Sequence, residues 1–569
     1  MAAYLPRKVI RNAVLLVNVV FLLLLCYLLF WLGSDVLQRE QHGGGAKITR
    51  KPVMPPELAP ELAPIAEESL VVNLGKLHCF HLWGLPEACW AFQRVFRRTA
   101  FDMVAQRTWV PKNLIVSRAA SRFGRSEYLY YDWITVGQLA EMSQEGLPPG
   151  SRGIVDISAR KLENSVSVGR LYVATEPWDL AQVGRGRYVS AVTALFGEDC
   201  VEPRINWRRD DTPYRNNGGM PVYVDVARAQ VNSVQEKPRL RVDPDGKFKV
   251  VQLADLHLVP GKGECRDEFP PTENCEADVK TMKFVNDVLD IERPDMVVYT
   301  GDQITGDLCD NDAETPLLKA FAPAIQRRIP FAVIWGNHDD AGSLNRLQLS
   351  QYVEALPFSL FKIGPRDTMD RSFGMGNYVH QVLGENGHPE ITFYFVDTHS
   401  YAPNPRGRRV YDWVKEEQWQ YFEDCHAKLE HTELSLAFLH IPLPEYLDVK
   451  SKKDPQKYNQ FLGTFREGVT APRHNSGGAE RLARLGVSAV TAGHDHCNDY
   501  CLQTDFRDID PKIWMCYGGA AGEGGYGGYG GTERRIRIFE IDTREKRIET
   551  WKRLNSSPND KFDAHLIYP

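Results

Sequence analysis

The sequence has little excess charge of either sign. Its 68 Lys and Arg residues against 74 Asp and Glu residues give a formal net charge of -6 at pH 7 over 569 residues. Surfaces that bind nucleic acid carry a basic excess, so we expect no nucleic-acid partner. The hydrophobic fraction of 43% is ordinary for a globular protein and excludes disorder throughout. A chain of this length exceeds one hydrophobic core, and we expect two folded units.

A phosphate-binding P-loop is also missing. The tract from Tyr517 to Gly531 is rich in glycine, but no Gly-Lys-Ser/Thr ends it. Two interpretations of the tract stay open. It is either a flap or substrate loop, in which glycine lets the backbone approach closely, or a flexible connector between strands expected at 513–516 and 535–539.

One long apolar run stands near the N-terminus. Residues 13–32 are numerous enough to cross a hydrocarbon core, and three basic residues precede them within residues 1–12. The run exceeds a usual signal-peptide core, and no small-x-small cleavage site follows it, so we expect a transmembrane signal anchor. The positive-inside rule then predicts a cytosolic tail at 1–12 and a single-pass type II protein of the secretory pathway or vacuole, with its bulk lumenal. The Pro-rich residues 33–69 are expected to be a stalk.

Cysteines are few, and ten of the eleven lie outside the apolar run. An even number on the lumenal side permits disulfides. Cys265 with Cys275, and Cys497 with Cys501, are near enough in sequence to pair, although unpaired structural cysteine is equally compatible with the pattern. Asn555 begins a glycosylation sequon, which predicts a glycoprotein.

The pattern of apolar segments divides the rest of the chain in two. Residues 70–237 contain short apolar segments separated by Gly, Pro and Asp, which predicts a β-rich accessory domain with some helix around 88–97. Residues 238–569 show strands alternating with amphipathic helices, which predicts an α/β domain. Its main strands are expected at 248–253, 295–299, 331–334, 392–396, 435–439 and 488–491, and its helices at 279–290, 416–431 and 478–485.

Residue types that bind metals follow five of these six strands. They are Asp255-Leu256-His257, Gly301-Asp302, Gly336-Asn337-His338-Asp339, His440 and Gly493-His494-Asp495-His496. A lone Asp-x-His is more often a core histidine or a capping aspartate, and Gly-Asn-His-Asp alone is compatible with a turn. Strand ends in an open α/β sheet converge on one crevice, so five such segments in order argue against coincidence.

This series of blocks, over about residues 248–498, resembles that of the calcineurin-like metallophosphoesterases. Within that superfamily it is similar to the purple-acid-phosphatase-like branch, which includes fungal cell-cycle-regulator phosphatases. The resemblance implies a β-sandwich flanked by helices and two divalent or trivalent metal ions, for which Fe, Mn and Zn suit the ligand types. It assigns one ion to Asp255, His257 and His496, the other to Asn337, His440 and His494, and a bridging role to Asp302.

The sequence departs from its relatives at one block. Purple acid phosphatases carry a tyrosine ligand at the position of Thr305, so we expect no tyrosinate–iron charge-transfer band. Serine/threonine phosphatases place Asp and Arg where Thr305 and Gly306 stand. The partner that would orient His338 is therefore not identified from the sequence.

The resemblance implies hydrolysis of phosphomonoesters by a metal-bridging hydroxide, with His338 protonating the leaving oxygen. The expected partner is a phosphorylated substrate, either a protein phosphoserine or phosphothreonine or a small phosphomonoester. One alternative is a phosphodiesterase acting on nucleotides or lipid headgroups. Another is a membrane-tethered binding protein, against which the intact set of ligands argues. His399 and Tyr401 follow the strand at 392–396 and line the pocket mouth in one interpretation, the protein surface in the other.

Overall fold

The computed structural model describes twelve ranges of the chain, and structural statements below refer to them. They are residues 69–82, 88–95, 101–115, 123–147, 150–217, 220–230, 237–365, 372–403, 407–451, 461–504, 512–528 and 530–568. The expected tail at 1–12, the anchor at 13–32 and all of the stalk except Ser69 lie outside these ranges. Within them, no helix combines the length and the apolarity that a membrane crossing requires.

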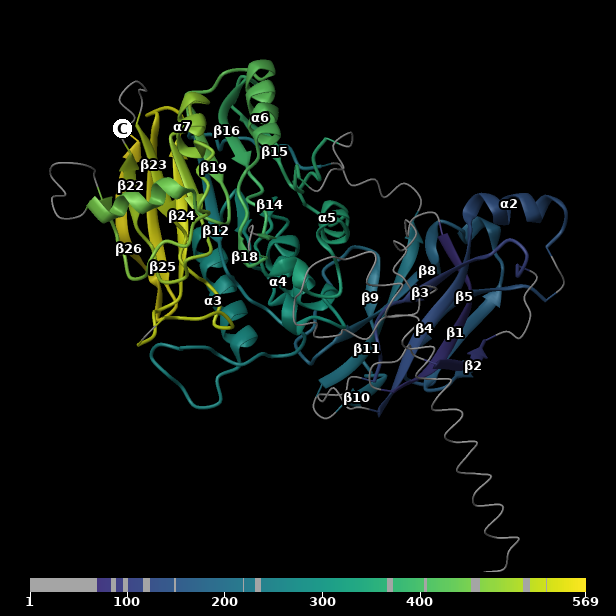
Figure 1. Ribbon diagram of the computed structural model, residues 1–569. Helices are drawn as coiled ribbons and strands as arrows, with labels where there is room; N and C mark the ends of the chain where they lie inside the picture. The colour runs from purple at the N-terminus through teal and green to yellow at the C-terminus, as the bar shows by residue number, and fades with distance from the viewer. Residues whose placement is uncertain are drawn as a thin grey trace, which may run out of the picture.

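Two mixed β-sheets form the C-terminal part of the protein (Figure 1). The six-stranded sheet has the order β14 (Phe331–Ile334), β13 (Met296–Thr300), β12 (Lys247–Leu253), β24 (Arg535–Asp542), β25 (Arg547–Leu554) and β26 (Ser557–Tyr568). The seven-stranded sheet has the order β15 (Tyr378–Leu383), β16 (Pro389–Phe395), β19 (Leu434–Phe438), β21 (Ala489–Ala492), β23 (Ile513–Tyr517), β22 (Cys501–Thr504) and β20 (Phe461–Leu462).

The two sheets pack face to face and carry helices on their outer sides. Aromatic rings meet between the sheets, as where Phe438 of β19 lies 6.5 Å from Phe539 of β24. Side chains on the other face of the seven-stranded sheet pack against Trp419 of α6 (Glu416–Lys428) and Leu482 of α7 (Gly478–Arg484). Parallel strands β12, β13 and β14 are connected by α3 (Ala277–Glu292) and α4 (Glu314–Gln326), with α5 (Arg346–Glu354) after β14. The predicted β-sandwich flanked by helices is confirmed.

The N-terminal part is built mainly of strands. Its sheets have the orders β2-β1-β4-β3, β10-β11-β8 with β9 on β11, and β5-β7-β6. The bounds are β1 (Ser69–Leu82), β2 (Ala88–Arg94), β3 (Gln106–Val110), β4 (Phe123–Thr135), β5 (Arg152–Ser158), β6 (Ser165–Val168), β7 (Leu171–Pro177), β8 (Arg185–Phe196), β9 (Trp207–Arg209), β10 (Arg215–Asn217) and β11 (Met220–Gln230), with one α-helix, α2 (Val136–Gln144).

The helix predicted around residues 88–97 is wrong. Residues 88–94 form β2, which pairs antiparallel with β1. The segment contains Trp90 and Phe92, residue types that suit a pleated sheet. Its sequence is compatible with either helix or strand, and pairing with the long strand β1 makes it a strand.

One of the two candidate disulfides is present. Cys265 bonds to Cys275, as the spacing suggested. The pairing of Cys497 with Cys501 is wrong, because Cys501 bonds to Cys516 and Cys497 is a free, buried thiol. Antiparallel strands β22 and β23 place Cys501 directly opposite Cys516, with Cα atoms 4.0 Å apart, and this register cannot be read from sequence spacing.

Candidate metal centre

The seven expected ligand residues all lie in loops that follow strands, at one edge of the sandwich. Asp255 and His257 follow β12, Asp302 follows β13, Asn337 follows β14, His440 follows β19, and His494 and His496 follow β21. All seven side chains are buried. Four of them, Asp255, His257, Asp302 and His494, stand in the left-handed backbone region, with φ between 51° and 76°. Non-glycine residues adopt this conformation at a cost in free energy, and such residues gather at functional sites.

The first cluster consists of Asp255, His257 and His496. The Nε2 atoms of the two histidines are 3.1 Å apart, and Nε2 of His496 is 3.5 Å from a carboxylate oxygen of Asp255. Two ligand atoms bound to one ion at about 2.0–2.2 Å lie roughly 3 Å from each other. The separations within this cluster therefore suit a shared metal ion.

The second cluster consists of Asn337, His440 and His494. Nε2 of His440 lies 3.2 Å from Oδ1 of Asn337 and 3.3 Å from Nδ1 of His494. Asp302 stands between the clusters, because its Oδ2 atom lies 3.3 Å from Nε2 of His440 and 3.8 Å from Nε2 of His257. A single carboxylate thus reaches both groups of ligands.

Hydrogen bonds orient the imidazole rings toward the clusters. Nδ1 of His440 is 2.8 Å from the carbonyl oxygen of Thr300, and Nδ1 of His496 is 2.8 Å from that of Tyr526. A carbonyl only accepts, so Nδ1 carries the proton in both rings and Nε2 is left for a metal ion. These contacts are the ones that ligand histidines make with their surroundings.

The charge state of two of the histidines also fits metal binding. Burial lowers the pKa of His257 and of His494 to about 3, which keeps these imidazoles neutral as ligands must be. Burial acts to lower the pKa of His440 as well, but the nearby Asp302 and Asp255 carboxylates outweigh it and raise that pKa to about 9, so this imidazole has to release a proton when it binds an ion. The nitrogen of His494 that faces the second cluster is Nδ1, 3.3 Å from Nε2 of His440. The residues present therefore fit a pair of metal ions.

The glycine-rich tract is packed against the first cluster. A Cβ atom at Gly522 would lie 2.0 Å from the carbonyl oxygen of Leu256, and one at Gly525 would lie 2.5 Å from the ring of His496 and 2.6 Å from that of His257. Tyr526 stacks on His496 with ring centroids 3.9 Å apart. The tract thus joins β23 to β24 and also brings its backbone close to the first cluster.

His338 lies beside the clusters and is half-buried. Its ring is 5.3 Å from that of His257, and its backbone N–H donates to Oδ1 of Asp302 at 2.8 Å. The Asp339 carboxylate accepts hydrogen bonds from the N–H groups of Gly336 and Asp302, which fixes the turn that carries His338. The Thr305 hydroxyl lies 3.3 Å from Nδ1 of His257, so its contact is with a candidate ligand histidine.

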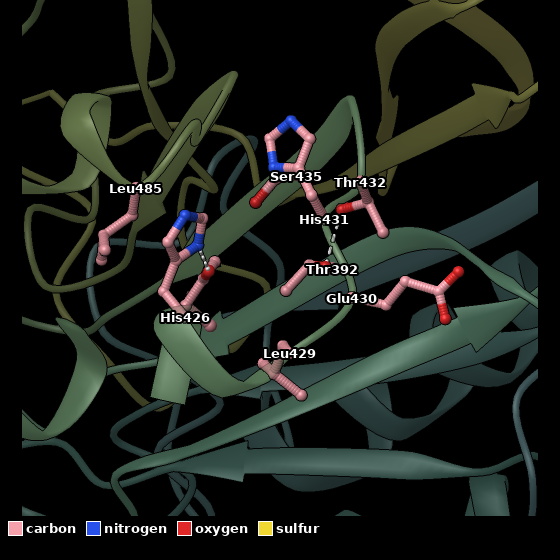
Figure 2. A pocket seen from close by; sticks show the side chains of 9 residues that line it. Thr392, His426, Leu429, Glu430, His431, Thr432, Ser435 and Leu485 are labelled. Atoms are coloured by element: carbon pink, nitrogen blue, oxygen red, sulfur yellow. Dashed lines mark hydrogen bonds between the residues drawn. The ribbon is translucent and has the colours of Figure 1, made fainter. Parts of the chain in front are cut away.

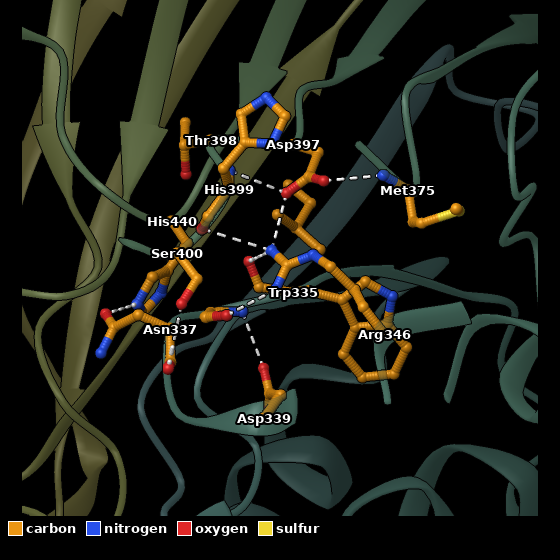
Figure 3. A network of polar contacts seen from close by, with 12 residues as sticks. Trp335, Asn337, Asp339, Arg346, Met375, Asp397, Thr398, His399, Ser400 and His440 are labelled. Carbon is orange, nitrogen blue, oxygen red and sulfur yellow. Dashed lines mark hydrogen bonds and ion pairs between the residues drawn. The ribbon is translucent and has the colours of Figure 1, made fainter. Parts of the chain in front are cut away.

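A buried ion pair supports this turn from behind (Figure 3). Arg346 of α5 donates to the carbonyl oxygen of Gly336 at 3.0 Å and pairs with the Asp397 carboxylate at 2.7 Å. Asp397 also accepts the backbone N–H of His399. The His399 ring is buried, with Nε2 2.7 Å from Oε1 of Gln418 on α6. The His399 imidazole thus contacts helix α6. The sequence had suggested that it lines the pocket mouth or lies on the protein surface.

Tyr401 borders the centre, together with two residues that the sequence did not single out. Its hydroxyl accepts a hydrogen bond from Nδ2 of Asn337 at 3.1 Å. Tyr401 begins β17 (Tyr401–Pro403), which pairs with β18 (Arg409–Tyr411). Tyr411 stacks on Tyr401 at 5.3 Å and meets the His494 ring edge-on at 4.6 Å, while the Arg409 guanidinium lies 4.2 Å from the Tyr401 ring centroid. No spacing motif marks Arg409 or Tyr411, because their place depends on the hairpin.

A separate pocket lies toward the other end of the seven-stranded sheet (Figure 2). It is lined by polar residues that include Thr392, His426, His431 and Ser435. Its interior has room for about one water molecule, so it does not suit a substrate.

Comparison with known proteins agrees with this geometry. The family model described as calcineurin-like phosphoesterase matches residues 248–498. Phosphatase DCR2 of Saccharomyces cerevisiae is 46% identical over 506 residues, which are 87% of this chain and 87% of the yeast protein. The chain belongs to the calcineurin-like phosphoesterase family. It is therefore a phosphoric ester hydrolase.

Other proteins match at lower sequence identity. A protein of Arabidopsis thaliana described as probable inactive purple acid phosphatase 28 is 34% identical, covering 58% of this chain and 86% of the plant protein. Among solved structures, a dimetal phosphatase from Danio rerio is 14% identical with a TM-score of 0.37, covering 57% of this chain and 99% of that one.

Proposed function

We propose that the protein hydrolyses phosphomonoesters at a dinuclear metal centre formed by the two clusters. The position of Asp302, within 3.8 Å of a ligand nitrogen in each cluster, is the observation that carries this proposal. Bound metal ions supply an activated water molecule and neutralise charge on the phosphoryl oxygens. Fe, Mn and Zn all accept this mixture of carboxylate, amide and imidazole ligands.

The roles of the protein's own residues follow from their places around the clusters. His338 is half-buried next to Asn337, so its imidazole can reach a bound ester and protonate the leaving oxygen. Tyr401 and Tyr411 form a wall beside Asn337 and His494. Arg409, whose guanidinium lies over the Tyr401 ring, is exposed, and none of the described carboxylates forms an ion pair with it, so its charge is available to a phosphorylated substrate.

The proposed substrate is a phosphomonoester, with protein phosphoserine or phosphothreonine as the first candidate to test. The location is proposed to be lumenal, in a type II protein anchored by residues 13–32. The disulfides Cys265–Cys275 and Cys501–Cys516 support an oxidising compartment. A lumenal enzyme would act on substrates within the secretory pathway or the vacuole.

Hydrolysis of p-nitrophenyl phosphate and of bis-p-nitrophenyl phosphate, measured together with metal content, tests this function. We expect the wild type to prefer the monoester and to contain two metal ions per chain. Asp302→Asn should lose both ions and activity. His338→Ala should keep the ions and lose a factor of about 10²–10⁴ in kcat. Preference for the diester would establish the phosphodiesterase alternative, and a chain with two ions and no activity would contradict the proposal.

A further inference from the structure

A buried lysine connects the N-terminal β domain to the loop that carries two of the ligand residues. Lys319 lies on α4 with only 2% of its surface exposed. Its ammonium group donates to the carbonyl oxygens of Val259 and Gly261 at 2.6 and 2.7 Å. It also pairs with the carboxylate of Asp278 on α3 and, at 2.7 Å, with that of Asp199 in the N-terminal domain. One cation therefore joins four oxygen atoms from three parts of the chain.

The loop in question runs directly from the first metal cluster. Asp255 and His257 stand at its start, and Val259 and Gly261 follow within four residues of His257. The start is fixed by backbone hydrogen bonds to the neighbouring loop, such as that from His257 N–H to the Asp302 carbonyl oxygen at 3.0 Å. The continuation is held by Lys319 and by Asp278, whose carboxylate accepts the N–H of Val259 at 3.0 Å.

The N-terminal domain also touches this loop with its backbone. Gly197, directly after β8, faces Gly261 so closely that a Cβ atom at Gly197 would lie 2.7 Å from the Gly261 Cα atom. Both glycines have positive φ angles, of 99° and 84°. The turn after β8 therefore abuts the loop in the region where Asp199 reaches Lys319.

The charges in this contact are poorly compensated without Lys319. Oδ1 of Asp199 and Oδ1 of Asp278 are both buried and find no hydrogen-bond partner among the described residues. Removing one partner from a buried ion pair leaves an uncompensated charge, which is costly enough to move the groups around it. A change at Asp199 is thus expected to be felt at Lys319 and, through it, in the loop.

We propose that Asp199 is a positioning residue for the metal ion held by Asp255, His257 and His496. Through Lys319, the N-terminal domain holds the loop in the conformation that presents Asp255 and His257 to that ion. The inference rests on the ligand assignment made under the proposed function. It gives the N-terminal domain a part in metal binding, for which residues beyond the ligands typically matter by 10- to 100-fold in affinity.

Titration of the metal-free, full-length chain with Mn²⁺, and separately with Zn²⁺, tests the proposal by counting bound ions. Asp199→Asn should weaken the affinity for one of the two ions by about 10-fold or more and leave the affinity for the other unchanged. Thr193→Val is the matched control, since it removes a different contact between the N-terminal domain and α4, the hydrogen bond to Glu314, at a buried position that does not touch the loop. This control should bind both ions as the wild type does.

A second variant and a second background make the test specific. Gly197→Ala, which presses a methyl group on Gly261, should weaken the same ion even if Asp199→Asn does not fold. In a His257→Ala background, which has already lost that ion, Asp199→Asn should cause no further loss. Unchanged affinity in Asp199→Asn and Gly197→Ala, or equal losses in Asp199→Asn and Thr193→Val, would overturn the proposal.

Failure of the proposed function would look different. A wild type that binds two ions without hydrolysing p-nitrophenyl phosphate contradicts the function and leaves the positioning role standing. A wild type that binds neither ion overturns the ligand assignment and this inference with it.

Discussion

At the scale of single residues, the absence of a side chain at Gly525 leaves room for the rings of two candidate ligand histidines. Gly525→Ala would put a methyl group about 2.5 Å from the His496 ring and 2.6 Å from that of His257. The rings must move to relieve this overlap, so we expect about a 10-fold or greater loss of affinity for the first metal ion. Ion counting by metal titration measures it. Gly468→Ala, where the added Cβ atom would have no neighbour within 4 Å, is the control. Full affinity in Gly525→Ala would show that the two rings can move without loss of metal binding.

Arg409 gives a second prediction at this scale. Its guanidinium lies over the Tyr401 ring and is exposed, so it is placed to attract a phosphorylated substrate. It does so without touching the candidate metal-ligand residues. Arg409→Gln should raise KM for a phosphomonoester about 5-fold, which is roughly 1 kcal/mol, with little change in kcat. Steady-state kinetics at low and high salt would show the difference shrinking as salt screens the charge. Arg484→Gln, at an exposed position of α7, should leave KM unchanged, and an equal effect there would show that Arg409 acts only as general surface charge.

At the scale of secondary structure, the strands that hold candidate ligands were the part most readily predicted. The strand expected at 331–334 is β14 with the same bounds, and its apolar residues lead directly into Gly336 and Asn337. Where only tertiary contacts decide, prediction failed. β2 depends on its pairing with β1, and the direction of the His399 ring depends on Gln418, which comes from a helix.

The disulfide between β22 and β23 gives a prediction for these elements. Cys501 and Cys516 are 15 residues apart, and closing a loop of that size in the unfolded chain corresponds to about 3 kcal/mol of stability. The double variant Cys501→Ala/Cys516→Ala should lose about that much in unfolding by guanidinium. Cys425→Ala, at a free cysteine on α6, serves as the control. Equal midpoints for the two variants would mean that strand pairing alone holds this edge.

At the scale of the whole molecule, helix α4 contacts the N-terminal part of the chain at the end of β8, where the backbone N–H of Phe196 donates to the Thr315 hydroxyl at 3.1 Å. Its first residue, Glu314, pairs with Lys112 at 2.6 Å and with Arg204 at 2.7 Å, both from the N-terminal part. Lys112 and Glu314 are 202 positions apart, and neither belongs to a recognisable motif. The division into two regions followed from composition and pattern, but their interface depends on ion pairs that no local pattern contains.

Glu314 makes this interface sensitive to acid. Burial acts to raise its pKa, but the charges of Lys112 and Arg204 outweigh burial and lower it from 4.5 to about 2. A carboxyl group with a depressed pKa in the folded state contributes stability that is complete above its unfolded pKa and is lost as the pH falls toward its folded pKa. The shift corresponds to about 3 kcal/mol, present above about pH 5 and lost between about pH 4.5 and 2.

Glu314→Gln should therefore be less stable than the wild type at pH 7, by about 3 kcal/mol, because Lys112 and Arg204 lose their shared partner. The difference between the two proteins should narrow steadily below about pH 4.5, since the wild-type carboxyl group then becomes protonated as well. Urea unfolding at a series of pH values measures this directly. Glu480→Gln, at an exposed ion pair of α7, should differ little from the wild type at any pH. A gap for Glu314→Gln that stays constant down to pH 3 would show that packing, and not the charge of Glu314, holds the two parts together.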